Sequence, residues 1–527
     1  MHNSSTQLSH VDASLVKALL RIDAFPHPAE DIELMETHIS WVILAGNYAY
    51  KIKKPVVLDF LDFGTLEKRR HFCEEELRLN RPWAPELYLD IVAVTGSADE
   101  PLMGGDGEAL EYAVKMLRFD QDLRLDRQLE AGLLTVTDMK ELGQNIAARH
   151  ASAERPDPAD RERIVGQAVH YVRENFDHLG DIIEADDFRF LQDWTERELA
   201  KHDATLRQRF DDGFVRDCHG DLHLGNLVRL PSGITTFDCI EFNPDLRNTD
   251  VFADVGFLAM DLTEKGHPEL AAHFLNRYLE RSGDYEGSVL LDLYFIYRCL
   301  VRAKVAVIRA SERENDNAKT ADLAEARDYC DLAARQAAYR KPVLLLMHGF
   351  SGSGKTRVSG DLMAALPAIR LRSDVERKRL FGLEESASSE SEIGAGIYTD
   401  SADDRVYARL FELAARLLDS AHNVILDAAF LDADRRGEAL AVAGNAGCTA
   451  LIVSVSAPDN ILRQRLRDRA AARRDASEAG VAVLEHQLAN ADELSDAERR
   501  IAVNCDNSVS PDVNELIKRV NHAATIR

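Results

Sequence analysis

Residues 30–120, the first stretch with a clear pattern, contain short runs in which apolar and polar residues alternate. Examples are "HISWVILAGNYAYKIKK", "LYLDIVAV" and "EYAVKML". Predicted turns separate these runs from one another. A period of two is typical of strands with one buried face. The run "TLEKRRHFCEEELRLNR" has helical character instead. We therefore expect an antiparallel sheet that one helix interrupts.

Helical periodicity dominates the second stretch, residues 121–335, apart from a strand, a turn and a second strand around residues 227–238. The charged, alanine-rich run "RASERENDNAKTADLAEARDYCDLAARQAAYRKP" predicts one long helix near the end of this stretch. That helix should break at Pro342, because proline lacks the N–H group that a helix needs. We expect a domain boundary at residues 336–342.

The third stretch begins at Pro342 and has a different texture. Its runs "PVLLLMHGF", "AIRLRSD", "NVILDAAF" and "TALIVSVSA" are short and continuously apolar, with helical segments between them. Such runs are typical of parallel strands buried on both faces. We therefore predict two domains, residues 1–335 and residues 342–527. The first should comprise an N-lobe of about residues 30–120 and a helical C-lobe of about residues 121–335.

The composition indicates a globular protein without membrane segments. Hydrophobic residues make up 45% of the 527 residues and charged residues 29%, and no apolar run is long enough to span a bilayer. The opening "MHNSSTQLSH" does not resemble a secretion signal, so we expect a cytoplasmic location and no membrane partner. The seven cysteines show no CxxC spacing, which favours buried reduced thiols over disulfides or a zinc site.

Acidic charge is concentrated in the first part of the chain. Residues 342–527 hold 23 basic and 28 acidic residues, a net charge of −5, so −21 of the total of −26 lies in residues 1–341. Such a surface repels polyanions and attracts cations, which disfavours nucleic acid as a partner and favours cationic acceptors for this half. Solubility alone is an equally good explanation of the acidity. The sequence predicts no oligomeric state.

The run "HGDLHLGN", residues 219–226, has the layout of a kinase catalytic loop. Asp221 and Asn226 show the D-x4-N spacing, which predicts Asp221 as the base and Asn226 as a magnesium ligand. Two apolar runs joined by "PSG" follow, and a hairpin there would return Asp238 to the side of Asn226. Because a hard cation takes oxygen ligands, Asp238 is predicted as a second ligand.

Upstream, "YAYK" is similar to the third-strand lysine motif of kinases, and alternation places Ala49 and Lys51 on one face. Lys51 would bind the inner phosphates of ATP and pair with a glutamate of the following helix. "CEEEL" offers Glu74, Glu75 and Glu76, of which we favour Glu76. The alternative is a solvated lysine and an exposed glutamate face.

The loop and the later "FDCIEF" resemble the aminoglycoside phosphotransferase and choline kinase branch of the kinase-like fold. The resemblance covers roughly residues 30–335 and implies a bilobal α+β domain that uses ATP and Mg²⁺. It also implies that His219 supports the loop structurally. The sequence departs from kinases in having "LAGN" in place of a GxGxxG loop, and Cys239 rather than a DFG-type sequence after Asp238.

"GFSGSGKT" matches the G-x4-G-K-[ST] motif and lies between a predicted strand and a predicted helix, the context that this phosphate-binding motif requires. Its backbone N–H groups and the helix N-terminus would bind phosphates, while Lys355 reaches the outer phosphates and Thr356 holds magnesium. The predicted nucleotide contacts are Gly349, Ser351, Gly352, Ser353, Gly354, Lys355 and Thr356.

Two strand ends after this motif favour a kinase over a motor protein. Asp374 follows "AIRLRS" and would accept the proton of a hydroxyl substrate, with Arg372 and Arg377 nearby. Asp427 ends "NVILD" at the position expected for magnesium or its water shell. "RQRLRDR" places arginines 463, 465, 467 and 469 on a helix, where Arg465 and Arg469 would close over the transferring phosphate. An exposed, salt-bridged helix face is the alternative.

This second half resembles the gluconate kinase, polynucleotide kinase and zeta-toxin-like group of small P-loop kinases, which implies an α/β P-loop fold with a parallel sheet. The order of the halves resembles bacterial proteins that fuse an aminoglycoside phosphotransferase-like part with an ATP-binding part. We expect a bifunctional ATP-dependent phosphotransferase for small hydroxyl acceptors. The alternatives are a regulatory pseudokinase in one half, or a nucleic-acid 5'-hydroxyl kinase in the C-terminal half.

Overall fold

The chain divides into two compact units in a computed structural model that describes residues 13–58, 61–180, 182–313, 315–338, 340–385, 387, 396–472, 480–508 and 513–525. The first unit comprises Met1–Leu142, Arg149–Ile182 and Thr195–Asp261, and the second comprises Gly143–Ala148, Ile183–Trp194 and Leu262–Arg527. The second unit therefore holds the helices of residues 268–337 together with the C-terminal strands. This division differs from the boundary at residues 336–342, which stays a prediction about the domains.

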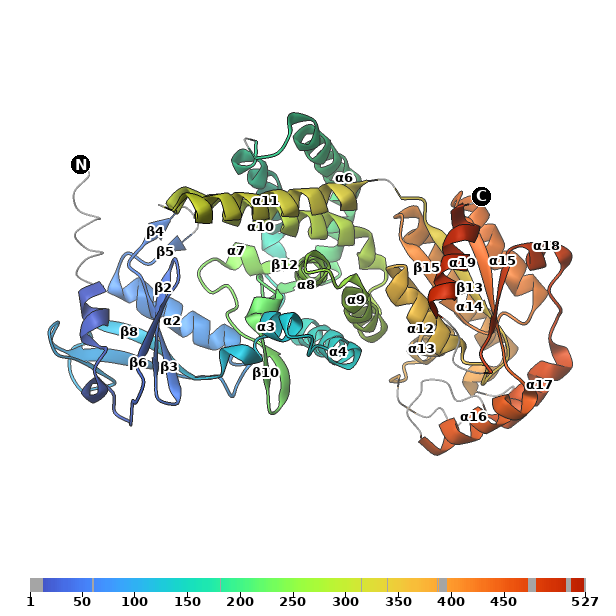
Figure 1. The fold of residues 1–527 in the computed structure, drawn as a ribbon, viewed down its shortest axis with the longest axis horizontal. Coiled ribbons are helices and arrows are strands. Elements are labelled where there is room, and N and C mark those ends of the chain that lie inside the picture. The colour runs from blue at the N-terminus through green and yellow to red at the C-terminus, as the bar shows by residue number, and fades with distance from the viewer. Residues whose placement is uncertain are drawn as a thin grey trace. The chain divides into compact units, whose positions relative to one another are not determined.

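The first unit contains a six-stranded antiparallel sheet, as the alternating runs predict (Figure 1). One face of the sheet packs its alternate apolar residues, such as Ile43, Tyr50 and Ile52, against Leu15 and Leu19. Helix α2 (Leu66–Asn80) lies against the strands β6 and β8, and Thr65 caps its N-terminus. The strand order is β1 (Glu33–Glu36), β2 (Ser40–Ala45), β3 (Tyr48–Lys53), β8 (Glu111–Leu117), β6 (Tyr88–Gly96) and β7 (Pro101–Met103).

The described residues before 262 also form three two-stranded sheets, and one of them confirms the predicted hairpin. Strands β10 (Leu227–Leu230) and β11 (Gly233–Thr236) pair antiparallel, with Leu227 opposite Thr236. The other pairs are β4 (Val57–Leu58) with β5 (Leu61–Asp62), and β9 (Val215–Asp217) with β12 (Asn248–Asp250). The helices are α3 (Leu125–Glu130), α4 (Val136–Ser152), α5 (Arg161–Glu174), α6 (Ala185–Asp211), α7 (Pro244–Arg247) and α8 (Val251–Glu264).

The second unit begins its continuous part with three long helices: α9 (Pro268–Ser282), α10 (Leu291–Glu312) and α11 (Asp316–Ala337). The prediction of a single long helix ending at Pro342 is wrong. Asn315 caps a new helix by accepting hydrogen bonds from the N–H groups of Asn317 and Ala318, so the run splits between α10 and α11. Helix α11 then ends at Ala337.

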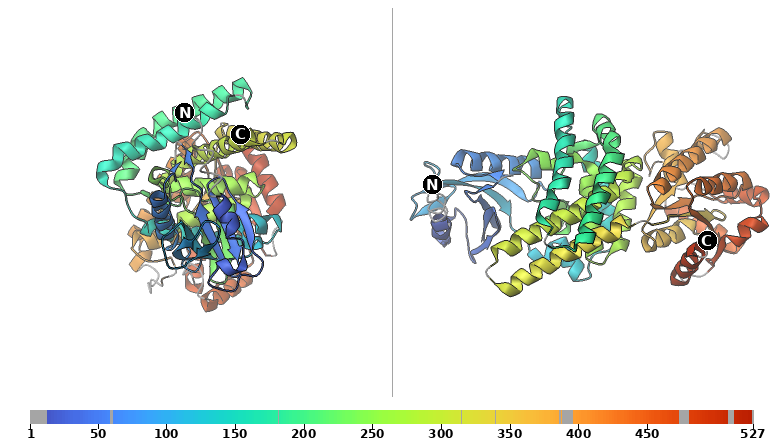
Figure 2. Two further views of the ribbon diagram at one scale, coloured as in Figure 1. Left: turned by 90° about the vertical axis from the view of Figure 1, so that its left-hand side faces the viewer. Right: turned by 90° about the horizontal axis from the view of Figure 1, so that it is seen from above.

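The C-terminal sheet has five parallel strands, as the continuous apolar runs predict. Helices α12 and α19 cover one face and α14 and α15 the other (Figure 2). The strand order is β14 (Ala368–Arg372), β15 (Asn423–Asp427), β13 (Val343–His348), β16 (Thr449–Ser456) and β17 (Ala502–Asp506). The helices are α12 (Lys355–Ala365), α13 (Ser373–Leu380), α14 (Asp400–Asp419), α15 (Ala433–Asn445), α16 (Asp459–Ala472), α17 (Val481–Asn490), α18 (Asp496–Arg500) and α19 (Val513–Thr525).

Short 3₁₀ helices connect several of these elements. They are η1 (Ile22–Ala24), η2 (Gln121–Leu123), η3 (Pro158–Asp160), η4 (Asn175–His178), η5 (Leu224–Asn226), η6 (Glu286–Leu290) and η7 (Gly396–Tyr398). Among the described residues, no helix combines the length and the apolar character that crossing a bilayer requires. The seven cysteines are free thiols, and six of them are buried, which agrees with the expectation from their spacing.

Candidate active sites

The first candidate site is centred on Lys51, whose ammonium group lies between two carboxylates. Its Nζ donates to Glu76 Oε1 at 2.9 Å and to Asp238 Oδ1 at 2.5 Å. Strand alternation turns Lys51 away from the Tyr50 side of the sheet and toward helix α2. Glu76 is the glutamate that reaches it, because Glu76 shares the buried stripe of α2 with Cys73, whereas Glu74 and Glu75 pair with arginines of their own helix.

A second buried ion pair, between Lys53 and Glu241, lies beside the first and was not predicted from the sequence. Lys53 Nζ donates to Glu241 Oε1 and, at 2.8 Å, to Glu76 Oε2, so Glu76 bridges both lysines. The signal was available, since Lys53 lies two positions after Lys51 and therefore on the same face. Lys53 and Glu76 are fully buried, so each charge here depends on its partners.

Electrostatics favours the charged forms of Lys51 and Glu76. Burial acts to lower the pKa of Lys51, but the charges of Asp238 and Glu76 outweigh it and hold the pKa well above its usual value. Burial likewise acts to raise the pKa of Glu76, yet the two lysines hold that pKa at about 2. Burial raises the pKa of Glu241, against the opposing charge of Lys53. Lys51 is therefore a fixed cation at this site.

The loop 219–226 is held by a buried carboxylate from helix α8. Asp254 accepts hydrogen bonds from the backbone N–H groups of His219 at 2.8 Å and Gly220 at 3.0 Å. His219 Nε2 lies 3.0 Å from the carbonyl oxygen of Phe237, and burial lowers the pKa of its ring. These contacts fit the structural role that the family resemblance implies for His219.

Asp221 is the exposed carboxylate of this loop, with 39% of its side chain accessible. Asn226 Nδ2 donates to Asp221 Oδ2 at 2.9 Å and to the Asp221 carbonyl oxygen at 3.0 Å. His223 Nε2 lies 3.4 Å from the same carboxylate. The loop therefore fixes the orientation of Asp221 while leaving it accessible to a substrate hydroxyl.

The hairpin β10–β11 returns the chain to this loop, since the N–H of Phe237 donates to the Asn226 carbonyl oxygen at 3.0 Å. Asp238 follows in a left-handed conformation, with φ of 64°, which is uncommon for residues other than glycine. Its N–H donates to the Tyr88 hydroxyl, and the next N–H, of Cys239, donates to Asn80 Oδ1. The surrounding structure thus holds a strained backbone, which is common at functional sites.

The oxygens of Asn226 and Asp238 suit a hard divalent cation such as Mg²⁺, which binds carboxylate and amide oxygens. The side chain of Asp238 is 44% exposed, so it is accessible to a ligand. Lys51 contacts the same carboxylate, which places a phosphate-binding cation next to the candidate metal ligand. The residues present therefore fit a metal–nucleotide complex.

The second candidate site is the glycine loop, residues 349–354, between β13 and α12. Gly349, Gly352 and Gly354 adopt φ of 139°, 85° and 93°, values that favour glycine. The loop ends at the N-terminus of α12, where Lys355 Nζ donates to the carbonyl oxygens of Gly349 at 2.8 Å and Phe350 at 3.0 Å. Lys355 thus lies over the loop, and the helix N-terminus supports anion binding there.

Among the lid arginines whose side chains the structure describes, Arg465 contacts the glycine loop. Its Nη1 lies 3.4 Å from the Gly352 carbonyl oxygen and 3.3 Å from that of Ser353. Its Nη2 donates to the carbonyl oxygen of Asn507, whose side chain also donates to Ser353 O at 2.7 Å. Arg463 instead pairs with two acidic residues, which fits the alternative of an exposed helix face. The side chain of Arg469 lies outside the described residues.

Of the two predicted carboxylates of this site, one ends a strand and the other lies in the helix that follows the neighbouring strand. Asp427 ends β15, and its Oδ2 accepts a hydrogen bond from Ser359 Oγ of α12 at 2.9 Å. Asp374 does not end a strand, since β14 stops at Arg372, and it lies half-buried in the first turn of α13. Arg372 and Arg377 are both engaged by carboxylates, at 3.5 Å from Glu385 and at 2.5 Å from Asp403 respectively.

Thr356 and Asp427 provide hydroxyl and carboxylate oxygens, the donor set that Mg²⁺ prefers. Ser359 connects the two residues, because its hydroxyl lies 3.0 Å from the Thr356 carbonyl oxygen and 2.9 Å from Asp427 Oδ2. With the glycine loop and Lys355 beside them, these residues fit a nucleotide with its metal. Arg370, which also contacts Ser359 at 3.3 Å, was not predicted.

Gly349→Ala is expected to destabilise the loop by about 1–3 kcal/mol, because a Cβ atom there would lie 2.2 Å from the carbonyl oxygen of Val455 and φ is 139°. The midpoint of thermal unfolding should fall, and ATP-dependent stabilisation of the second site should be lost. Gly437→Ala in α15 is the matched control, since an added Cβ meets nothing within 4 Å. An unchanged melting midpoint for Gly349→Ala would contradict the tight loop.

Two family models match the sequence, and both agree with the folds described above. The family described as "Phosphotransferase enzyme family" matches residues 124–288, and the one described as "AAA domain" matches residues 344–494. The chain is 30% identical over 473 residues to an uncharacterized protein of Mycobacterium tuberculosis strain H37Rv, covering 88% of this chain and 92% of that protein. An uncharacterized protein of Mycobacterium bovis matches with the same identity and the same coverage of both chains.

This chain belongs to the family of those mycobacterial proteins. The two matched segments of this chain correspond to a phosphotransferase-type kinase domain and a P-loop kinase-like domain. The fold class predicted from the sequence is confirmed, namely a kinase-like domain followed by an α/β P-loop domain with a parallel sheet.

Solved structures similar to parts of this chain include two enzymes. A gluconokinase from Sinorhizobium meliloti 1021 is 18% identical, with a TM-score of 0.25, and the match covers 36% of this chain and 94% of that one. A choline kinase from Cryptosporidium parvum Iowa II is 12% identical, with a TM-score of 0.36, and the match covers 57% of this chain and 88% of that one.

Proposed function

We propose that the protein is an ATP-dependent phosphotransferase with two sites, each of which transfers the γ-phosphate of ATP to a hydroxyl group of a small acceptor. The observation that carries the proposal is the position of Lys51 between Glu76 and Asp238. A buried lysine held by a helix glutamate next to a candidate metal ligand is the arrangement that protein-kinase-like phosphotransferases require. The glycine loop with Lys355 supports the second site.

At the first site, Asp221 accepts the proton of the acceptor hydroxyl as its oxygen attacks the γ-phosphorus. The bond from that phosphorus to the β–γ bridging oxygen breaks, and ADP leaves. Lys51 binds the inner phosphates, and Asn226 and Asp238 would hold Mg²⁺. When bound, Mg²⁺ neutralises the charge that develops on the phosphate oxygens.

At the second site, Asp374 in the first turn of α13 has the corresponding base role. Backbone N–H groups of the glycine loop and Lys355 bind the phosphates, while Thr356 and Asp427 would hold Mg²⁺. Arg465 lies at the carbonyl side of the loop and is the described candidate for contacting the transferring phosphate. Arg469 remains a second candidate by its spacing on α16.

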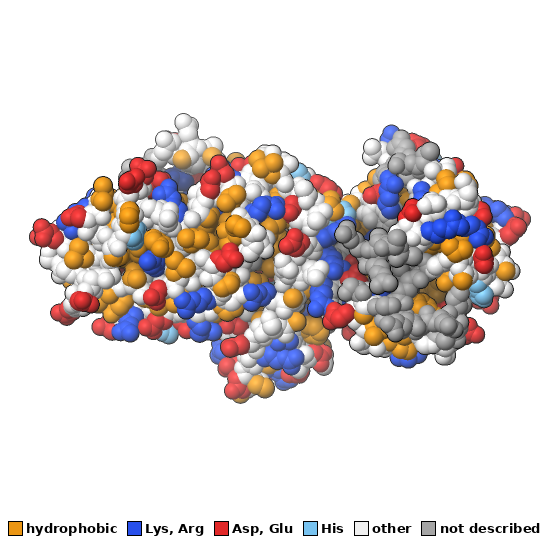
Figure 3. Space-filling view, turned by 90° about the horizontal axis from the view of Figure 1, so that it is seen from below, with side chains coloured by type: hydrophobic (Ala, Val, Ile, Leu, Met, Phe, Trp, Pro, Cys, Tyr) orange, Lys and Arg blue, Asp and Glu red, His pale blue; other side chains and the backbone are white. Residues whose placement is uncertain are grey.

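The acceptors are small molecules, and the charge distribution supports this class over nucleic acid. The protein carries a net charge of −26. On the face drawn in Figure 3, basic and acidic side chains are interspersed rather than gathered in one basic patch. Polyanion binding depends on clustered basic residues. Cationic hydroxyl compounds are the acceptors that the acidic first half favours.

The test is acceptor-dependent ADP formation by the full chain with a panel of sugars, amino alcohols and aminoglycosides. Lys51→Met is expected to abolish one set of reactions and Lys355→Met another, each by roughly 100-fold or more, because each lysine stabilises phosphate charge. Lys518→Met, on the exposed side of α19, is the control and should change neither. ADP formation that no acceptor stimulates would refute the proposed activity.

A second candidate function for the first site is nucleotide sensing without transfer. The sequence before Lys51 supports it, since residues 30–50 contain one glycine, Gly46, whereas many kinases have a glycine-rich loop over the phosphates before this lysine. Only two residues separate Ala45 of β2 from Tyr48 of β3. Gly46 is fixed in this tight turn, because a Cβ atom would lie 2.4 Å from the Pro28 carbonyl oxygen. ATP binding that Lys51→Met removes, without transfer to any acceptor, would favour sensing.

A further inference from the structure

Helix α9 is docked on the edge strand β14 through the amide of Asn276. Its Nδ2 donates to the Ala368 carbonyl oxygen at 2.9 Å, and its Oδ1 accepts from the N–H of Arg370 at 2.7 Å. A side-chain amide thus pairs with backbone groups that a neighbouring strand would otherwise satisfy. Both partners lie in the second compact unit, although α9 belongs to the segment matched by the phosphotransferase family and β14 to the segment matched by the AAA domain.

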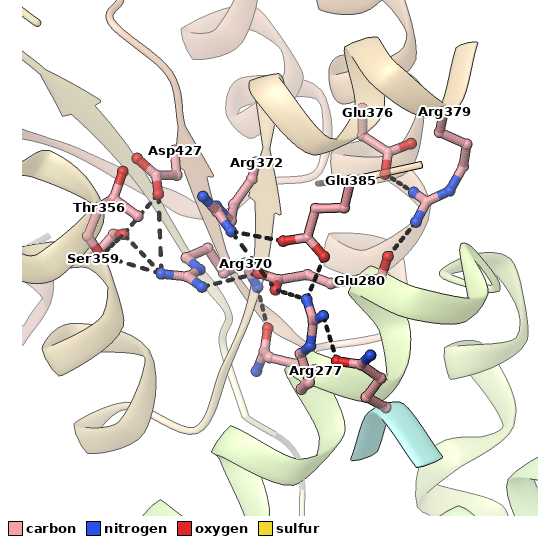
Figure 4. A network of polar contacts seen from close by, with 12 residues as sticks. Arg277, Glu280, Thr356, Ser359, Arg370, Arg372, Glu376, Arg379, Glu385 and Asp427 are labelled. Carbon is pink, nitrogen blue, oxygen red and sulfur yellow. Dashed lines mark hydrogen bonds and ion pairs between the residues drawn. The ribbon is translucent and has the colours of Figure 1, made fainter. Parts of the chain in front are cut away.

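One helical turn after Asn276, Glu280 points to the same strand and pairs with Arg370 (Figure 4). Arg370 Nη2 donates to Glu280 Oε1 at 2.9 Å, and the two side chains are 10% and 5% exposed. Burial acts to raise the pKa of Glu280, but the charges of Arg370 and Arg372 outweigh it and hold the pKa below its usual value. Glu280 is therefore a buried anion that Arg370 needs.

The other terminal nitrogen of Arg370 points to the proposed magnesium ligands of the second site. Nη1 donates to the Thr356 carbonyl oxygen at 3.2 Å and to Ser359 Oγ at 3.3 Å, and lies 4.0 Å from Asp427 Oδ2. Ser359 in turn donates to Asp427 at 2.9 Å. Figure 4 shows the continuous chain of contacts from Glu280 through Arg370 to Thr356, Ser359 and Asp427.

We propose that Glu280 is a positioning residue for the second site: it holds Arg370 so that Asp427 stays available for Mg²⁺. This inference rests on the proposed phosphotransferase activity of the glycine loop and adds its dependence on helix α9. The first matched segment thereby contributes a side chain on which the second segment's metal site depends, so the two are coupled parts of one enzyme.

The physical reason is competition for the carboxylate of Asp427. A buried guanidinium must be paired, and without Glu280 its nearest other carboxylate is Asp427. A direct Arg370–Asp427 ion pair would occupy the oxygen that Mg²⁺ needs. The neighbouring side chains Arg372 and Arg277 cannot neutralise Arg370, because both are cations. Glu385 is another nearby carboxylate, but it already accepts hydrogen bonds from Arg372 at 3.5 Å and from Arg277 at 2.5 Å.

The experiment measures binding of a fluorescent, non-hydrolysable ATP analogue to the full chain as a function of Mg²⁺ concentration. The signal of the second site is the part that Lys355→Met removes. Glu280→Gln is expected to raise the Mg²⁺ concentration at half-saturation of that signal roughly 3- to 30-fold. Adding Arg370→Gln should reverse most of the increase, because the misdirected cation is then gone. Glu280→Asp, which keeps the charge, should lie between wild type and Glu280→Gln.

The matched control is Glu384→Gln. It breaks the exposed ion pair, at 2.6 Å, between Glu384 and Arg281 of helix α9, the helix that also carries Glu280. Among the described contacts, this pair makes none with Arg370 or the glycine loop. If the Mg²⁺ concentration at half-saturation is the same in Glu280→Gln as in Glu384→Gln, the proposal is overturned. An increase that Arg370→Gln fails to reverse would overturn it as well, since a docking defect alone predicts that result. If Glu280→Gln does not fold, an Mg²⁺ dependence of Glu280→Asp equal to wild type overturns it.

The same experiment separates this inference from the proposed function. If Lys355→Met removes none of the nucleotide signal, the second site itself fails. If Lys355→Met removes the signal and the Glu280 variants match wild type, the phosphotransferase proposal stands and the coupling fails.

Discussion

Asp221→Asn is expected to lower the rate of one of the two proposed phosphoryl transfers by about 100- to 10,000-fold, the range typical of losing a general base. The substitution keeps the size of the side chain and an oxygen that can accept from Asn226, but removes the group that takes the proton. Because Lys51 and Asp238 are unchanged, nucleotide affinity should stay within about twofold of wild type. Steady-state ADP formation and binding of an ATP analogue measure the two quantities.

Asp212→Asn, an exposed change in the same unit, is the control for charge removal and should leave both transfers intact. The other transfer should be unaffected in Asp221→Asn. If Asp221→Asn abolishes both transfers, the chain has one chemical site rather than two. If it abolishes neither, Asp221 is not the base.

Asp374→Asn is expected to lower the other transfer by a similar factor of about 100 to 10,000. Asp374 lies in the first turn of α13, directly after the strand whose end faces the glycine-loop edge of the sheet. Its loss removes a proton acceptor and leaves Lys355 and Thr356 in place, so ATP binding should persist. Single-turnover transfer with excess enzyme distinguishes a slow chemical step from slow product release.

Asp434→Asn is a close control, since Asp434 also lies in the first turn of a helix, α15, and is exposed. It matches the change in helix N-terminal charge without approaching the glycine loop. An equal decrease in the transfer rate in Asp374→Asn and in Asp434→Asn would show that the charge at the helix N-terminus, rather than proton transfer, explains the effect. A rate unchanged in Asp374→Asn would exclude it as the base.

The parts of the first site that local periodicity governs were predictable. Strand alternation places Lys51 on the α2 face, and the helical stripe through Cys73 selects Glu76 from three consecutive glutamates. The hairpin between residues 227 and 236 follows from two apolar runs around a turn. Lys53 and Glu241 were missed because a charged side chain on a strand is read as solvated unless its buried partner is known.

Contacts between residues far apart in the chain were not predictable by such reasoning. Glu280 and Arg370 are 90 residues apart, and neither belongs to a recognised motif. The run at residues 309–342 is predicted as one helix because most of its residues favour helices. The side chain of Asn315 caps a new helix within the run, so the run belongs to two helices. The edge strand β17 was missed because its buried and exposed positions alternate, unlike the continuously apolar strands of the same sheet.

The docking of Asn276 on β14 has a consequence for dividing the protein at Pro342. A C-terminal fragment cut at that proline would carry the whole parallel sheet but would leave the outer edge of β14 bare at Ala368 and Arg370. A bare edge invites pairing with other chains, and a buried arginine would be stranded without its anion. A fragment that keeps both partners must therefore begin before α9, which divides the segment that the phosphotransferase family matches.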